Sequence, residues 1–191
     1  MTREFGATAW GRAWLKMIEP VLITGPPDRD LPRARALARR AIEDLTIEGN
    51  RATARLTERG HEHTITLNIP IWNHKEQTAV AHAIGQASSS RSGDLPDHLV
   101  TELTSAKVRI APLIDDITAT SDTGEASRQH VLAICYALVQ KIDEEPELAV
   151  RLRTPCDPAS KTKSLTPDGL LPLTAINPRR FYGQSERRDS T

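Results

Sequence analysis

Cysteines, aromatic residues and long apolar runs are all scarce in this chain of 191 residues. Two cysteines are too few for a disulfide framework or a cysteine-rich metal site, so we interpret both as free thiols. No stretch approaches the ~20 apolar residues of a membrane span, and no apolar run follows the charges of the first residues. Glycine-rich phosphate-binding loops are also missing. We therefore expect a soluble, cytoplasmic protein with no membrane partner.

The few aromatic residues, 4% of the chain, include three tryptophans. Trp10, Trp14 and Trp72 each lie in phase with apolar neighbours. We expect them to anchor the core and not to stack on nucleic-acid bases.

The charges are balanced overall but unevenly distributed. Lys and Arg number 25, as do Asp and Glu, so the formal net charge is zero. Residues 1–40 carry 8 basic against 4 acidic side chains, residues 41–150 carry 9 against 17, and residues 151–191 carry 8 against 4. Such a distribution can steer a charged partner, and it can equally reflect docking of the basic ends onto the acidic middle.

Hydrophobic periodicity predicts an α+β fold. Helical spacing of apolar residues indicates helices over residues 8–18, 31–41, 73–87, 95–105 and 127–144, with a further turn after Pro146. Alternating apolar residues indicate strands over residues 45–47, 51–57 and 63–71. These form an antiparallel meander with one buried face, and the extended residues 108–120 lead out of it. We expect three or four antiparallel strands packed by helices.

Polar residues predict where three of these helices begin. Asp30 is expected to cap the second helix, and Asp94 the helix over 95–105. Asn73 with Glu76 three residues later has the pattern of a capping pair.

The segment ITATSDTGEASRQH, residues 117–130, resembles a zinc knuckle without its thiols. Two further stretches, FGATAWGRAWLKMIE (5–19) and DLPRARALARRAIEDLTIEGNRATARL (30–56), precede it. In this order the three resemble the SWIM-type zinc-finger proteins of actinobacteria, over roughly residues 5–153. In that family a strand ends in Cys-x-Cys, and Cys-x-His opens the next helix.

The resemblance places Ser121, Thr123 and Arg128 at the three cysteine positions and leaves His130 as the one ligand type present. Tetrahedral zinc needs four donors at about 2.0–2.3 Å, which a guanidinium and two hydroxyls cannot supply. We therefore expect no zinc and no other cofactor. His130 is instead expected to hydrogen-bond the loop that zinc would have organised.

SWIM proteins are interaction modules, and the bacterial members are associated with Swi/Snf-type helicases. The resemblance therefore implies a non-enzymatic accessory module that binds a protein partner, such as a helicase, and nucleic acid as a further ligand. The alternative within binding is a protein-interaction scaffold that binds no nucleic acid.

Arginines dominate the polar side of the predicted helix over 31–41. Their guanidinium groups suit phosphate contacts, whereas the alternative is an ordinary solvated helix face. The sheet arginines extend such a patch if the helix packs near the polar face of the sheet. The candidate residues for binding nucleic acid or a partner are Arg29, Arg33, Arg35, Arg39, Arg40, Arg51 and Arg55.

Two further groups suggest metal chemistry. His61 and His63 lie on one side of a strand start, but two ligands are too few for a site. An acidic cluster around the knuckle would be the hard-cation site of a metal-dependent hydrolase; it consists of Asp115, Asp116, Asp122 and Glu125. Acidic residues ahead of a helix are also expected for capping and dipole reasons.

We expect three regions along the chain. Residues 1–112 form an N-terminal region of helices and antiparallel sheet, and residues 113–153 form a degenerate SWIM-like ββα region. Residues 154–191, rich in proline and basic side chains, are expected to be a flexible tail.

Overall fold

The computed structural model describes residues 5–20, 28–87, 95–124 and 126–155. Its strands are β1 (Ile42–Glu48), β2 (Arg51–Glu58), β3 (His61–Asn68) and β4 (Thr118–Ser121). Its helices are α1 (Ala9–Ile18), α2 (Asp30–Arg40), α3 (His74–Ala87), α4 (His98–Ser105), α5 (Arg128–Glu144) and α6 (Glu147–Arg151). The predicted α+β class is confirmed. The expected tail lies outside the described residues from residue 156 onward, as does the expected cap Asp94.

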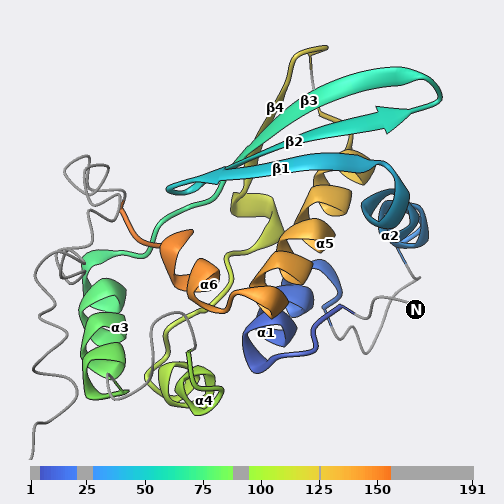
Figure 1. Ribbon diagram of the computed structural model, residues 1–191. Coiled ribbons are helices and arrows are strands. Elements are labelled where there is room, and N and C mark those ends of the chain that lie inside the picture. Colours follow the sequence, from blue (N-terminus) through green and yellow to red (C-terminus); the bar gives the residue numbers. More distant parts are fainter. Residues whose placement is uncertain (1–4, 21–27, 88–94, 125, 156–191) are drawn as a thin grey trace, which may run out of the picture. The chain divides into compact units, whose positions relative to one another are not determined.

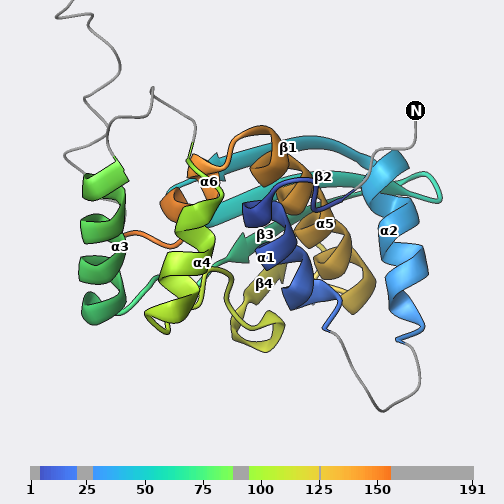
Figure 2. The ribbon, with the colours of Figure 1, turned by 90° about the horizontal axis from the view of Figure 1, so that it is seen from below.

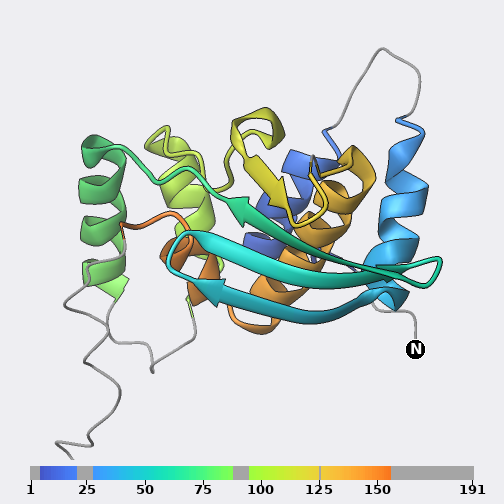
Figure 3. The ribbon, with the colours of Figure 1, turned by 90° about the horizontal axis from the view of Figure 1, so that it is seen from above.

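The four strands form one antiparallel sheet in the order β1-β2-β3-β4 (Figure 3). The first three are the predicted meander, in which Ala54 lies opposite both Leu45 and Ile65. The fourth is the last part of the predicted extended segment, and it pairs with β3 although α3 and α4 intervene in the chain. Within residues 113–153 the expected ββα element is β4, an isolated bridge between Ser121 and Gly124, and α5.

One face of the sheet packs on helices and the other is open. In β2 and β3, Ala52, Ala54, Leu56, Ile65 and Leu67 are buried. Figures 1 and 2 show the described helices gathered on this side, with α5 beneath the strands. On the open face the cross-strand register aligns one row of hydroxyls, formed by Thr46, Thr53, Thr66 and Thr120.

Helix α5 is the centre of the core. Its buried residues include Leu132, Ile134, Tyr136 and Leu138, and it packs against α1, α2, β1 and β3. Residues on both sides of the expected boundary at 112/113 contribute to this one hydrophobic core.

Helix α1 is fastened to α5 through Asp143. The Asp143 carboxylate accepts hydrogen bonds from the backbone N–H of Gly6 at 2.7 Å and from the N–H and hydroxyl of Thr8 at 2.9 and 3.0 Å. Thr8 in turn caps α1, accepting from Gly11 N–H at 2.9 Å. Trp10 and Trp14 point into the core with no exposed surface, as predicted.

Helices α2 and α5 run parallel and side by side (Figure 2). Asp30 near the start of α2 accepts from Gln129 at 2.8 Å, and Arg35 one turn later lies over the Tyr136 ring at 5.6 Å. The predicted cap is wrong in one detail. The side chain that binds the start of α2 is Asp28, which accepts from the N–H of Asp30 at 2.9 Å, while Asp30 reaches α5.

The remaining helices follow the predicted signals closely. Asn73 and Glu76 form the predicted reciprocal capping pair, each accepting from the other's backbone N–H at 3.0 Å. Helix α4 begins at His98 and not at Leu95. No helix in the described part of the chain is long and apolar enough to cross a membrane.

Candidate functional site

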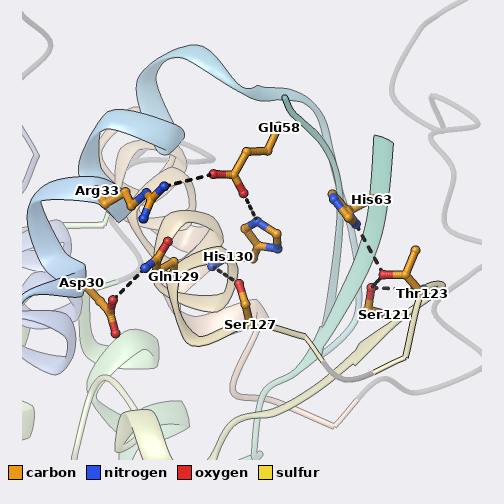
Figure 4. Close-up of polar contacts among 9 residues, drawn as sticks. All are labelled: Asp30, Arg33, Glu58, His63, Ser121, Thr123, Ser127, Gln129 and His130. Atoms are coloured by element: carbon orange, nitrogen blue, oxygen red, sulfur yellow. Dashed lines mark hydrogen bonds and ion pairs between the residues drawn. The ribbon is translucent and has the colours of Figure 1, made fainter. Parts of the chain in front are cut away.

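The knuckle positions lie where β4 ends and α5 begins (Figure 4). The Ser121 and Thr123 hydroxyls are 3.1 Å apart, and Thr123 Oγ1 lies 3.4 Å from Nδ1 of His63 on β3. Ser127 caps α5 by accepting from the N–H of His130 at 3.3 Å. Hydroxyl and imidazole hydrogen bonds therefore organise the loop.

Arg128 turns away from this loop. Its guanidinium donates to Asp28 at 3.2 Å, next to the start of α2. The pKa of Asp28 is lowered, first because its carboxylate accepts the N–H of Asp30 and then because of Arg128. Arg128 thus links α5 to α2 and does not contact Ser121 or Thr123.

His130 reaches the sheet and not the loop, contrary to expectation. Its Nε2 lies 2.8 Å from Oε2 of Glu58, the last residue of β2, and Arg33 of α2 lies 4.0 Å from the other oxygen of that carboxylate. The hydrogen bond to His130 is the largest cause of a lowered Glu58 pKa. Figure 4 shows Glu58 between the two helices, with His130 on one side and Arg33 on the other.

The His63 and His130 rings pack with their centroids 5.1 Å apart. A polar chain therefore runs from Arg33 through Glu58, His130 and His63 to Thr123. At the four knuckle positions, Ser121 and Thr123 bond each other, whereas Arg128 and His130 bind carboxylates elsewhere. The described residues contain no group of three metal-ligating side chains. That this chain binds no zinc stays a prediction.

The candidate arginines do not form one patch. Helix α2 packs on α5, on the covered side of the sheet, whereas Arg51 and Arg55 lie on the open face. Arg29 and Arg40 are at opposite ends of α2, roughly 16 Å apart at ~1.5 Å rise per residue.

Most of these arginines contact other side chains of this chain. Arg35 pairs with Glu19, and this hydrogen bond raises its pKa. The Arg39 guanidinium lies 5.4 Å from the Phe5 ring centroid. Arg55 pairs with Asp44, with Glu62 at 3.2 Å and with Glu43 at 3.9 Å. Among the described residues, Arg29, Arg40 and Arg51 form no ion pair.

The acidic residues near the knuckle are separated along β4. Asp115 and Asp116 precede the strand, whereas Asp122 follows it and accepts from Thr64 N–H at 3.0 Å, which lowers the pKa of Asp122. Asp122 is six positions beyond Asp116 along a nearly extended chain, which corresponds to roughly 20 Å at ~3.3 Å per residue. Glu125 lies outside the described residues. The described members therefore do not converge on one cation.

Cys135 offers no nucleophile. It is fully buried in α5, and burial raises the pKa of its thiol to about 12, so the reactive thiolate does not form near neutral pH.

A groove of about 620 Å³ runs between α2, β1 and α5. Its apolar lining is Ala38, Ile42, Leu45 and Ala137, and its charged lining is Arg39, Arg40, Glu43, Lys141 and Glu144. Strand β1 is an outer strand of the sheet, and no described strand pairs with its free side. Two of the candidate arginines, Arg39 and Arg40, therefore border a groove beside the outer edge of β1.

Arg33, His63 and His130 were candidates from the sequence, whereas Glu58, which contacts Arg33 and His130, was not. Glu58 is the last residue of an alternating strand, where a polar residue is expected in any case, so nothing in the sequence indicates its contact with α5. The edge position of β1 was also not predicted, because the alternation of residues 45–47 defines faces but not strand order.

Comparisons with protein-family models, with curated proteins and with solved structures found no match. The geometry of the site and the SWIM resemblance are therefore the grounds for a function.

Proposed function

We propose that this chain is a non-enzymatic binding module that holds an extended segment of a protein partner along strand β1. The observation that carries the proposal is the groove between α2, β1 and α5, beside an edge of β1 that no described strand pairs with. A peptide that adds a strand to such an edge gains main-chain hydrogen bonds, and alternate side chains enter the adjoining groove.

The lining of the groove favours a particular kind of segment. Half-buried Ile42 and Leu45 provide apolar contact, and Ala38 and Ala137 leave room because their side chains are small. Side chains of both signs border the groove. A segment that alternates apolar residues with charges of both signs fits this surface.

Features of β1 also oppose pairing with a second copy of itself. The pairing register shifts between Ile42 and Asp44, and acidic residues occur at 43, 44 and 48. Bulges and like charges are common devices against uncontrolled edge pairing. Residues Leu45–Glu48 pair with β2 in regular register, so their backbone is extended and suited to pairing with a partner strand.

The SWIM resemblance favours a Swi/Snf-type helicase as the protein that supplies this segment. Nucleic acid has less support as the main ligand, because Arg33, Arg35 and Arg55 already pair with carboxylates. A metal-dependent hydrolase has the least support of these alternatives, because the described acidic residues lie at opposite ends of β4.

The test is co-purification of the tagged full chain from its host after nuclease digestion, with two variants. Ala137→Arg fills the groove from α5, and Ala36→Arg places the same side chain on the exposed side of α2. Both substitutions keep a good helix former, so neither should unfold the protein. Thermal unfolding of each variant checks this.

The proposal expects one protein partner to remain after nuclease, to bind Ala36→Arg as it binds the parent chain, and to be lost from Ala137→Arg. If the Ala137→Arg variant still captured the partner, the partner would bind outside the groove. Loss of every partner on nuclease digestion would instead favour nucleic acid as the ligand.

A further inference from the structure

Arg153 is a buried arginine that forms no ion pair with a described carboxylate. Its residue is 5% exposed, and one terminal N–H donates to the carbonyl of Pro70. Its Nε has no acceptor, and the guanidinium forms no ion pair within the described residues. The carboxylates of Glu76 and Asp116 act on this guanidinium only from beyond ion-pair distance, and a buried charge without a direct partner is costly to a fold.

Trp72 fixes the position of this guanidinium. The Cζ of Arg153 lies 5.5 Å from the Trp72 ring centroid, and the N–H of Trp72 donates to the Arg153 carbonyl at 2.7 Å. The indole N–H donates to the carbonyl of Arg109 at 2.8 Å. The buried tryptophan thus joins the backbone of two arginines.

The guanidinium lines a pocket of about 360 Å³. Two further cations, Lys107 and Arg109, and two carboxylates, Glu76 and Asp116, line it with Arg153. Glu76 is already engaged with the N–H of Asn73 at 3.0 Å, and the cations exceed the carboxylates by one. Burial is the largest cause of a lowered Arg153 pKa, and Arg109 lowers it further, whereas the charges of Glu76 and Asp116 raise it.

Lys107 enters the pocket lining at a conformational cost. Its φ of 59° lies in the left-handed region that favours glycine. Lys107 follows the end of α4, and its backbone N–H donates to the Thr104 carbonyl at 3.0 Å. Non-glycine residues in this conformation often accompany binding or catalytic sites.

We propose that this pocket binds a small molecule through an oxyanion, a carboxylate or a phosphate, with Arg153 as the central donor. The volume lies in the range of small-molecule sites, and the guanidinium fork matches the geometry of both groups. Lys107 and Arg109 add charge at the exposed side of the pocket. The carboxylates of Glu76 and Asp116 accept hydrogen bonds from hydroxyls on the same ligand.

Titration of the full chain with inorganic phosphate and, separately, with malate tests this site. The three tryptophan indole N–H signals in an NMR spectrum give an internal comparison, because Trp72 contacts the site and Trp10 and Trp14 are buried beneath the sheet without hydrogen-bond acceptors. A saturable shift of Trp72 alone is expected, with a Kd of about 1 mM or below.

Variants at exposed positions avoid the risk of unfolding that replacement of Arg153 carries. Lys107→Gln with Arg109→Gln should weaken binding by about tenfold or more, because charge-assisted hydrogen bonds are lost. The control replaces two exposed cations elsewhere, Lys16→Gln with Arg51→Gln, and should change the Kd by less than about twofold.

The better probe identifies the ligand class: tighter phosphate binding indicates a phosphate ester, and tighter malate binding indicates a carboxylic acid. The proposal is wrong if neither probe shifts Trp72 saturably up to ~10 mM. It is also wrong if all three indoles shift alike, or if the pocket variant binds as the parent chain does.

Discussion

Nε2 of His130 lies 2.8 Å from Oε2 of Glu58, 72 residues away in the sequence (Figure 4). The bond joins the first turn of α5 to the end of β2. In the SWIM pattern a metal would hold this histidine to cysteines in the neighbouring loop. Here a carboxylate on the sheet binds it, so this protein contact positions the start of α5.

Removing the Glu58 carboxylate should destabilise the fold. His130 is 9% exposed, and Glu58→Ala leaves its ring nitrogen without an acceptor, at a cost of about 1–3 kcal/mol. Urea denaturation at pH 7 measures the loss. Glu62→Ala, which breaks an exposed pair with Arg55, should cost less than about 1 kcal/mol. Equal losses at the two positions would contradict the role given to Glu58.

The same contact makes part of the stability depend on pH. The folded pKa of Glu58 is lowered from an ordinary value of 4.5, chiefly by the hydrogen bond to His130. A lowered carboxylate pKa stabilises the fold above the unfolded pKa, and this contribution is lost as the pH falls through the folded pKa. The stability gap between the parent chain and Glu58→Gln should therefore shrink as the pH falls below 4.5. Urea denaturation from pH 5 to pH 3 would contradict this if the gap widened below pH 4.5.

Gly11→Ala should destabilise the protein although alanine is the better helix former. A Cβ at position 11 would lie 2.0 Å from Oδ1 of Asp143 and would push that carboxylate off Gly6 and Thr8. We expect a net loss of about 2–4 kcal/mol in thermal or urea unfolding.

Gly85→Ala is the matched control for that substitution. No described atom lies within 4 Å of a Cβ at position 85 in α3, so a gain of up to about 1 kcal/mol is expected. Combining Gly11→Ala with Asp143→Ala should cost less than the sum of the two single losses, because each removes the same contact. Additive losses would contradict the clash.

Lys107→Gly should stabilise the fold while removing a cation from the Arg153 pocket. A φ of 59° is unfavourable for lysine by about 1 kcal/mol but not for glycine, so the free energy of unfolding is expected to rise by about 0.5–1 kcal/mol. Glu102→Gly inside α4 should lose a similar amount through helix propensity. If Lys107→Gly were as destabilising as Glu102→Gly, position 107 would carry no strain.

Local patterns in the sequence were sufficient for most elements. The alternation that placed Ala54 and Ile65 on one face is confirmed, as is the pair of Asn73 and Glu76, because each depends on residues close in the chain or on a period of two. The helical spacing of Trp10 and Trp14 likewise identified buried positions.

The contacts that build the candidate sites join distant residues and could not be predicted. Asp143 holds the N–H of Gly6 across 137 residues, and Glu58 holds His130 across 72. Sequence periodicity assigns a residue to a face but does not name its neighbour on another element. Arg153 was missed for the same reason, since it follows a short amphipathic turn and its burial comes from Pro70 and Trp72.

The most direct test of the binding proposal is amide hydrogen exchange of the chain alone and in complex with the partner captured after nuclease digestion. If the partner adds a strand at β1, the amides of Leu45–Glu48 that point away from β2 gain protection in the complex, and those of Thr64–Asn68 in the inner strand β3 do not change. Protection that appears elsewhere while Leu45–Glu48 exchange as before would contradict the account.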